Sequence, residues 1–141
     1  MDSYILLYIL VVIIGISVGG RINNVTSTLT LPSFYPPTYL FGLVWTILFF
    51  IFGIYLYYAS PELQIIGIIY FALVLAWTPL FTYSKSTAVG FYYLLLVVLL
   101  TITLFFVSIN YYSHPYPWLL VPQFLWTSFA TSIALALYRL N

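Results

Sequence analysis

Charged side chains are scarce in this chain: Asp, Glu, Lys and Arg together make up 4% of its 141 residues. A soluble domain keeps roughly a quarter of its residues charged, because its surface has to be hydrated. The shortage excludes a soluble globular domain, and a net charge of +1 leaves no basic surface for nucleic acid. The charged residues are Asp2, Arg21, Glu62, Lys85 and Arg139. The sequence therefore predicts an integral membrane protein.

Cysteine is absent altogether. The chain can form no disulfide, no thiolate nucleophile and no metal site built on sulfur. Its two carboxylates, Asp2 and Glu62, stand at the edges of separate apolar stretches and cannot form an acid–base pair inside a bundle. The single histidine, His114 in the segment SHPYP, is interpreted as a surface-loop residue in preference to a haem ligand. We accordingly predict no catalytic residue, no metal site and no tightly bound cofactor.

Apolar residues fill most of what remains, at 65% of the chain. They fall into five stretches, each close to the roughly 20 residues that a helix needs to cross a hydrocarbon core of about 30 Å. The stretches are Tyr4–Gly20, Tyr39–Ser60, Leu63–Tyr83, Ala88–Ile109 and Trp118–Tyr138. The first lacks the basic n-region and cleavage site of a signal peptide, so we expect it to remain as a helix. The predicted fold is all-α, a single domain over residues 1–141 with five transmembrane helices.

The basic residues favour one orientation of this bundle. Cytoplasmic loops collect Lys and Arg, and five crossings place Arg21, Lys85 and Arg139 on the same side of the membrane. We therefore expect the N-terminus outside and the C-terminus in the cytoplasm.

The longest connection, residues 21–38, ends in the segment LPSFYPPT. Proline fixes φ and disfavours helix in the residue before it, so Pro32, Pro36 and Pro37 stiffen this loop and force a helix to start near Thr38. Long connections in compact folds are often lids or binding loops. The residues alone leave two interpretations open, a rigid hinge with interfacial aromatic anchors and a lid over a cavity.

Two of the stretches carry a mostly aromatic side, formed by residues that recur at helical spacing. The sets are Gly42, Trp45, Phe49 and Phe52 on the second stretch, and Tyr70, Val74 and Trp77 on the third. Periodicity alone favours packing of these side chains within the bundle over contact with a ligand.

Three motifs resemble those of the translocator protein family, also called tryptophan-rich sensory proteins or peripheral benzodiazepine receptors. LPSFYPPTYLFGLVWT resembles the family's second-helix motif K-P-S-W-x-P-P-x-W-x-x-G-P-V-W-T. YFALVLAWTPLF resembles the third-helix motif Q-x-x-L-N-x-x-W-x-P-x-F. VPQFLWTSFATSIALALYRLN resembles the closing motif P-Y-x-x-W-x-x-F-A-x-x-L-N-x-x-x-W-x-L-N. The resemblance covers essentially the whole chain.

The chain departs from this pattern at several positions, many of them polar in the family. Around the second helix, Leu31 stands in place of the family's lysine, and Phe34 and Tyr39 stand in place of its two tryptophans. Leu43 stands in place of its proline. On the third helix, Tyr70 and Val74 stand in place of the family's glutamine and asparagine. On the fifth helix, Ala134 and Tyr138 stand in place of its asparagine and tryptophan. A few hydrogen-bonding groups orient a ligand in an otherwise apolar pocket. We therefore expect the cavity to keep its shape and to bind a different ligand or to bind less selectively.

The resemblance implies a receptor or transporter-like membrane protein that binds a planar, apolar ligand in a cavity closed by the loop 21–38. By resemblance the ligand is a tetrapyrrole such as protoporphyrin IX or haem, with a sterol or lipid as further candidates; a homodimer is left open. The residues that the resemblance places at the cavity are Phe34, Tyr39, Trp45, Phe49, Tyr70, Val74, Trp77, Trp126, Ala130 and Ala134. Trp118 is expected outside it, in the interfacial belt.

Two other functions stay open. Light-dependent breakdown of porphyrins has been linked to this family and would make the chain an enzyme, and a structural scaffold would bind no ligand. The sequence ends at Asn141 without the basic tail common in mitochondrial members. We therefore expect a prokaryotic plasma membrane in preference to the mitochondrial outer membrane.

Overall fold

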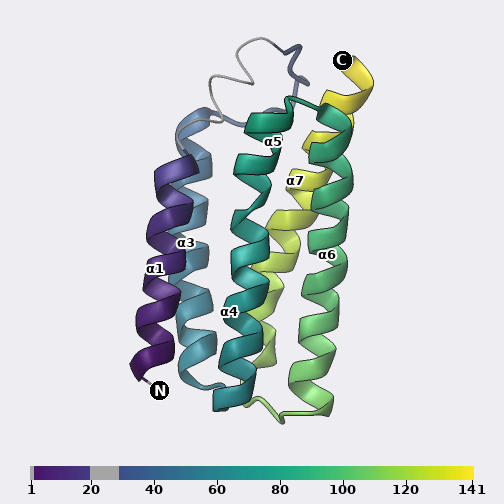
Figure 1. The fold of residues 1–141 in the computed structure, drawn as a ribbon. Coiled ribbons are helices and arrows are strands. Elements are labelled where there is room, and N and C mark those ends of the chain that lie inside the picture. Colours follow the sequence, from purple (N-terminus) through teal and green to yellow (C-terminus); the bar gives the residue numbers. More distant parts are fainter. Residues whose placement is uncertain (1, 20–28) are drawn as a thin grey trace.

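The computed structural model describes residues 2–19 and 29–141, and all regular structure in these ranges is helical. The helices stand side by side, with the C-terminus at the opposite end of the bundle from the N-terminus (Figure 1). The elements are α1 (Asp2–Gly19), α3 (Thr38–Tyr57), α4 (Pro61–Leu75), α5 (Trp77–Ser84), α6 (Thr87–Asn110), a 3-10 turn η1 (Pro117–Leu120) and α7 (Val121–Leu140).

Four helical segments of the described chain are long and apolar enough to cross a membrane: Tyr39–Tyr57, Pro61–Phe81, Thr87–Asn110 and Pro117–Leu140. The first predicted stretch, 4–20, forms the 18-residue helix α1 up to Gly19; residue 20 lies outside the described ranges. Side chains of α1 such as Leu6, Leu10 and Ile13 are exposed. A helix that is apolar all round suits a hydrocarbon surrounding. The prediction of an all-α membrane bundle is confirmed.

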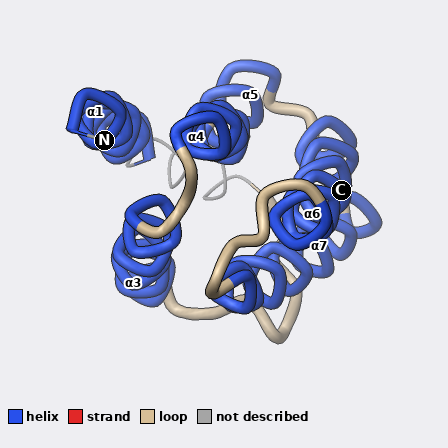
Figure 2. Tube along the Cα trace, turned by 90° about the horizontal axis from the view of Figure 1, so that it is seen from below, coloured by secondary structure: helices blue, strands red, loops and turns tan. Residues whose placement is uncertain are grey.

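The helices form a ring when they are viewed along their axes (Figure 2). On one side α1 contacts α3, α4 and α5, and on the other α6 packs along α7. The pair α4 and α5 contacts α6, while η1 contacts α3, α6 and α7. The ring therefore brings α3 and the start of α7, which are far apart in the sequence, to the same side of the bundle.

The third predicted helix, 63–83, is interrupted. α4 ends at Leu75 and α5 begins at Trp77, with Ala76 between them at φ −68° and ψ −15°. Pro79 lies in the first turn of α5, and because it has no N–H it cannot bond to the Leu75 carbonyl. The interruption thus falls within one turn of the proline, where a helical hydrogen bond is missing.

Two serines mark the starts of α4 and α6. The Leu63 N–H donates to Ser60 Oγ at 3.4 Å, and the Val89 N–H donates to Ser86 Oγ at 3.2 Å. Such caps satisfy backbone donors that have no partner within the helix. α3 starts at Thr38 directly after two prolines, as the sequence predicted.

Aromatic rings fill the core between α1, α3 and α4. Phe52 stacks on Phe71 with ring centroids 4.7 Å apart, and Tyr8 meets Phe71 edge-on at 5.6 Å. Because Gly67 of α4 has no Cβ, the side chain of Leu56 can pack directly against the α4 backbone. A Cβ at Gly67 would lie 2.8 Å from Leu56 Cδ2, which is too close. The close contact of α3 with α4 therefore depends on a glycine at this position.

Candidate ligand-binding site

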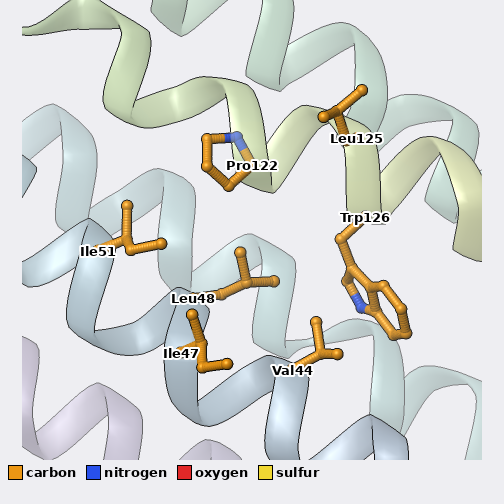
Figure 3. Close-up of a pocket in the computed structure, with 7 residues that line it drawn as sticks. All are labelled: Val44, Ile47, Leu48, Ile51, Pro122, Leu125 and Trp126. Carbon is orange, nitrogen blue, oxygen red and sulfur yellow. The ribbon is translucent and has the colours of Figure 1, made fainter.

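A groove of about 310 Å³ lies between α3 and the first turns of α7. Figure 3 shows the side chains that line it: Val44, Ile47, Leu48 and Ile51 from α3, and Pro122, Leu125 and Trp126 from α7. Ile47 is 50% exposed and Leu125 61% exposed, so the groove opens on the outer surface of the bundle, where the membrane lies. No ionisable group lines this α3–α7 groove, which can therefore bind an apolar molecule but supplies no acid or base.

Trp126 provides the only side-chain hydrogen-bond donor among the residues that line the α3–α7 groove. Its Nε1 is buried and has no hydrogen-bond partner, and in Figure 3 this nitrogen faces the side chains of α3. Buried tryptophan N–H groups usually find a partner. An unsatisfied donor directly beneath the wall of an apolar groove is therefore a candidate contact for a ligand that displaces the side chain covering it.

Aromatic contacts connect Trp126 to the segment before α3. The ring of Phe41 meets the Trp126 indole edge-on, with centroids 5.8 Å apart, and Tyr35 packs on Phe41 at 5.5 Å. The groove wall is thus continuous with residues 29–37, the described part of the predicted loop. The remainder of that loop, including Arg21, lies outside the described residues.

Polar side chains lie inside the bundle between α4, α6 and α7. The Tyr70 hydroxyl and Thr101 Oγ1 share a hydrogen bond of 2.6 Å between α4 and α6. Gln123, which is 3% exposed, approaches Tyr70 from α7. Neither its Oε1 nor its Nε2 makes a hydrogen bond of ordinary geometry. Because buried polar groups are rarely left unsatisfied, Gln123, which follows the groove residue Pro122 in the sequence, is an unusual buried amide.

A second, smaller cavity of about 200 Å³ lies between α6 and the start of α7. Phe105, Phe106 and Phe124 are among its lining residues, and Thr101 is its only hydroxyl. That hydroxyl is already engaged, because it bonds to Tyr70 and donates to the Val97 carbonyl at 2.8 Å. The second cavity therefore offers no free polar group to a ligand.

The interpretation of His114 as a surface-loop residue is wrong. Its side chain is 6% exposed and both ring nitrogens are bonded. The Tyr116 N–H donates to Nδ1 at 2.9 Å, so Nδ1 is unprotonated, and Nε2–H donates to the Tyr55 carbonyl at 2.8 Å. Burial lowers the pKa of this imidazole below its ordinary value, and the bond to Tyr55 opposes the shift. With both nitrogens in use, His114 is a structural residue and no haem ligand in this conformation.

Of the ten residues predicted at the cavity, Trp126 alone lines the α3–α7 groove. Trp45 and Phe49 are half-buried and pack against the aromatic core. Trp77 lies between α5 and α6, where its Nε1–H donates to the Gly90 carbonyl at 2.9 Å. These three side chains have structural partners, so their contact with a ligand stays a prediction.

The other predicted residues divide between interior and surface. Tyr70, Val74 and Ala134 are buried, and Ala130 is half-buried on α7. Phe34 is 49% exposed and Tyr39 is 74% exposed. Trp118 is 60% exposed at the start of η1, and its place in the interfacial belt stays a prediction.

Sequence reasoning missed the polar interior, namely Gln64, Thr101, Ser108, Gln123 and Thr127, all of them buried. The signal was present, since polar residues within long apolar runs face the inside of a membrane bundle. The apolar stretches contain no Asp, Glu, Lys, Arg or His, so these uncharged polar residues are the signal that they offer. Gln123 stands directly after the proline of the closing motif, so the sequence could have revealed it as a buried polar residue of α7.

Comparison with known proteins agrees with the motifs. The profile of the TspO/MBR family matches residues 4–139. A tryptophan-rich protein TspO of Chlorobaculum tepidum is 34% identical over 127 residues, covering 82% of this chain and 78% of its own length. The TspO of Archaeoglobus fulgidus is 30% identical over 118 residues, covering 78% and 75%, and protein CrtK of Rhodobacter capsulatus is 29% identical over 123 residues, covering 78% and 74%. With a match over nearly its whole length and an apolar helical bundle as its fold, this chain belongs to the TspO/MBR family of membrane proteins.

Proposed function

We propose that this protein binds a planar, apolar ligand, a tetrapyrrole such as protoporphyrin IX or haem, in the α3–α7 groove. The observation that carries the proposal is the unpartnered indole N–H of Trp126 in a groove wall that is otherwise apolar. A mostly apolar site with a few placed polar groups is typical of small-molecule binding. Trp126 then contributes a flat surface for the ligand and, once a side-chain shift uncovers its buried N–H, the donor that fixes the ligand's orientation.

The size and opening of the groove favour a flat ligand. Its volume of about 310 Å³ is at the low end of the roughly 300–1,000 Å³ found for ligand pockets. Because Ile47 and Leu125 are exposed at its mouth, a flat ring can rest one face on the groove and turn the other toward lipid. Apolar area buried in this way contributes about 25 cal/mol per Å², before the cost of immobilising the ligand.

The charge of the groove limits how such a ligand can lie. Lys85 and Arg139 are exposed near the ends of α5 and α7, and neither lines the groove. A carboxylate in hydrocarbon without a cationic partner is costly. The carboxylates of a porphyrin must therefore point to the membrane surface, while its uncharged edge faces Trp126.

Titration of the purified protein with protoporphyrin IX, followed by tryptophan emission, tests the proposal. Trp126→Phe keeps an aromatic ring but removes the N–H, and it should reduce both the quenching and the affinity. A loss of about 1.4 kcal/mol of contact corresponds to a tenfold weaker Kd. Trp118→Phe is the matched control, because Trp118 is exposed away from the groove.

Three results would count against this function or extend it. An absence of saturable quenching favours a scaffold role, and equal losses in Trp118→Phe and Trp126→Phe would place the ligand elsewhere. Loss of porphyrin absorbance that requires light and oxygen would add the enzymatic reaction linked to this family. Running the titration in darkness and then in light separates binding from breakdown.

A further inference from the structure

The side chain of Asn141, which follows the last residue of α7, is bonded to the segment that precedes α3. Asn141 Nδ2–H donates to the Thr30 carbonyl at 3.1 Å, and the Thr30 N–H donates to Asn141 Oδ1 at 3.1 Å. Both backbone groups of one residue are therefore paired with one side-chain amide. The two residues are 111 positions apart in the sequence.

The geometry of this pair requires an amide. An asparagine side chain carries a donor and an acceptor in one plane, as a peptide group does, so it can pair with the N–H and the C=O of a single residue. Asn141 Nδ2 also donates to the Leu137 carbonyl at 2.9 Å, which fixes the side chain on the last turn of α7. An aspartate could accept the Thr30 N–H but could not donate to the Thr30 carbonyl.

The segment held by Asn141 leads to the wall of the groove. Pro32 is buried and accepts a hydrogen bond of 3.1 Å from the Tyr35 N–H, which makes residues 32–35 a turn. Tyr35 packs on Phe41, and Phe41 packs on Trp126. Contacts therefore connect Thr30 at the end of the bundle with Trp126 in the groove.

We propose that Asn141 is a latch, a positioning residue that holds the segment 29–37 on the end of α7 and so keeps Tyr35, Phe41 and Trp126 in contact. Both partners of the latch are exposed, and water competes for exposed hydrogen bonds. The latch therefore opens and closes readily, and its opening loosens the wall of the groove. The effect on a ligand rests on the proposed function, whereas the latch itself does not.

Hydrogen exchange at the Thr30 amide measures the latch directly, because this N–H donates to Asn141. Exchange should be about tenfold faster in Asn141→Ala if the closed state loses the stability of one ordinary hydrogen bond. Asn141→Asp, which keeps only the acceptor, should give an intermediate rate. Asn110→Ala is the matched control, since Asn110 is an exposed asparagine that ends α6 at the other end of the bundle (Figure 1). Far-UV circular dichroism should show unchanged helix content in all three variants.

The link to the groove is tested by combining Asn141→Ala with Trp126→Phe. In the wild-type background Asn141→Ala should weaken protoporphyrin IX binding severalfold, and in the Trp126→Phe background it should have little further effect. Such non-additivity is expected only of sites that act through one another. A purely structural role would lower affinity equally in both backgrounds.

The outcomes separate the latch from the ligand. Unchanged exchange at Thr30 in Asn141→Ala, or an equal increase in Asn110→Ala, overturns the latch. Faster exchange at Thr30 with additive effects on binding overturns the link to Trp126. If the wild-type protein binds no protoporphyrin IX, the proposed function fails, and the exchange rates at Thr30 still decide whether the latch exists.

Discussion

The imidazole of His114 lies flat on the phenol ring of Tyr55, with ring centroids 4.3 Å apart and planes at 7°, while its Nε2–H donates to the carbonyl of the same tyrosine. At the next residue, Gln64 Nε2–H donates to the Leu56 carbonyl at 2.9 Å. The last carbonyls of a helix have no partner within it. Side chains from α4 and from the α6–η1 loop thus complete the end of α3.

The neutral form of His114 gives the protein a pH-dependent stability. Because burial lowers the pKa of this imidazole, the unfolded chain binds the proton more readily than the folded protein. The stabilisation is therefore fully present above the ordinary histidine pKa of about 6.5 and is lost as the pH falls below it. Thermal unfolding in detergent should show a Tm that decreases in this range for the wild type. In His114→Gln, which leaves Glu62 in place, the Tm should decrease less over the same pH range. An equal decrease of Tm in the variant and the wild type would assign the effect to another group.

The two buried glutamines should respond in opposite directions to the same substitution. Gln123→Met removes a buried amide that makes no hydrogen bond of ordinary geometry, so we expect the free energy of unfolding to rise by about 1–3 kcal/mol. Gln64→Met removes one of the two donors to the Leu56 carbonyl, which keeps the Ala59 N–H at 3.1 Å, and should lower the free energy of unfolding by about 0.5–1.5 kcal/mol, the net worth of one hydrogen bond. Unfolding of both variants in mixed detergent measures the difference. A decrease in Gln123→Met would mean that its amide is satisfied in the membrane.

Two glycines offer a second matched pair. A Cβ at Gly67 would lie 2.8 Å from Leu56 Cδ2, and Leu56 is fully buried. Gly67→Ala should therefore destabilise the bundle by about 1–3 kcal/mol through overpacking. A Cβ at Gly42 meets no atom within 4 Å, so Gly42→Ala should stabilise α3 by about 0.5–1 kcal/mol. The order of the two Tm values tests the α3–α4 contact, and the reverse order contradicts it.

The basic residues predict one orientation of the bundle in the membrane. Lys85 and Arg139 are both exposed, near the ends of α5 and α7 that lie at the same end of the bundle (Figure 1). We propose that this end is cytoplasmic. A reporter fused after Asn141 should then be active only on the cytoplasmic side, and one fused before Met1 only outside. The opposite pattern would place the Asn141 latch on the outer face.

The helices could be predicted from the sequence because the length of an apolar run is a local property. α3, α6 and α7 begin and end within a few residues of the predicted stretches. The position of the break at Ala76 was harder to predict, because the missing hydrogen bond at Pro79 is compatible with a break at several positions. Local patterns therefore fix where helices form more closely than where they bend.

The site was harder to predict because it depends on contacts between distant segments. His114 reads as a loop residue in SHPYP, and only the return of that loop to α3 shows that Tyr55 buries it. Trp77 and Trp126 occupy similar places in aromatic motifs, yet Trp77 bonds to Gly90 while Trp126 is left with a free N–H. Spacing along a helix cannot distinguish these two environments.

The side-chain caps on Tyr55 and Leu56 also affect how α3 meets bilayers of different thickness. Because His114 and Gln64 occupy these carbonyls from within the protein, this end of α3 needs neither water nor lipid headgroups to satisfy them. With 20 residues, α3 is about 30 Å long, close to the thickness of a hydrocarbon core. The exposed carboxylate of Glu62 at the start of α4 still holds this end of the bundle at the headgroups, because a charge in hydrocarbon is costly. A bilayer of different thickness should therefore not fray this end of α3, since the Tyr55 and Leu56 carbonyls keep their partners within the protein at either depth.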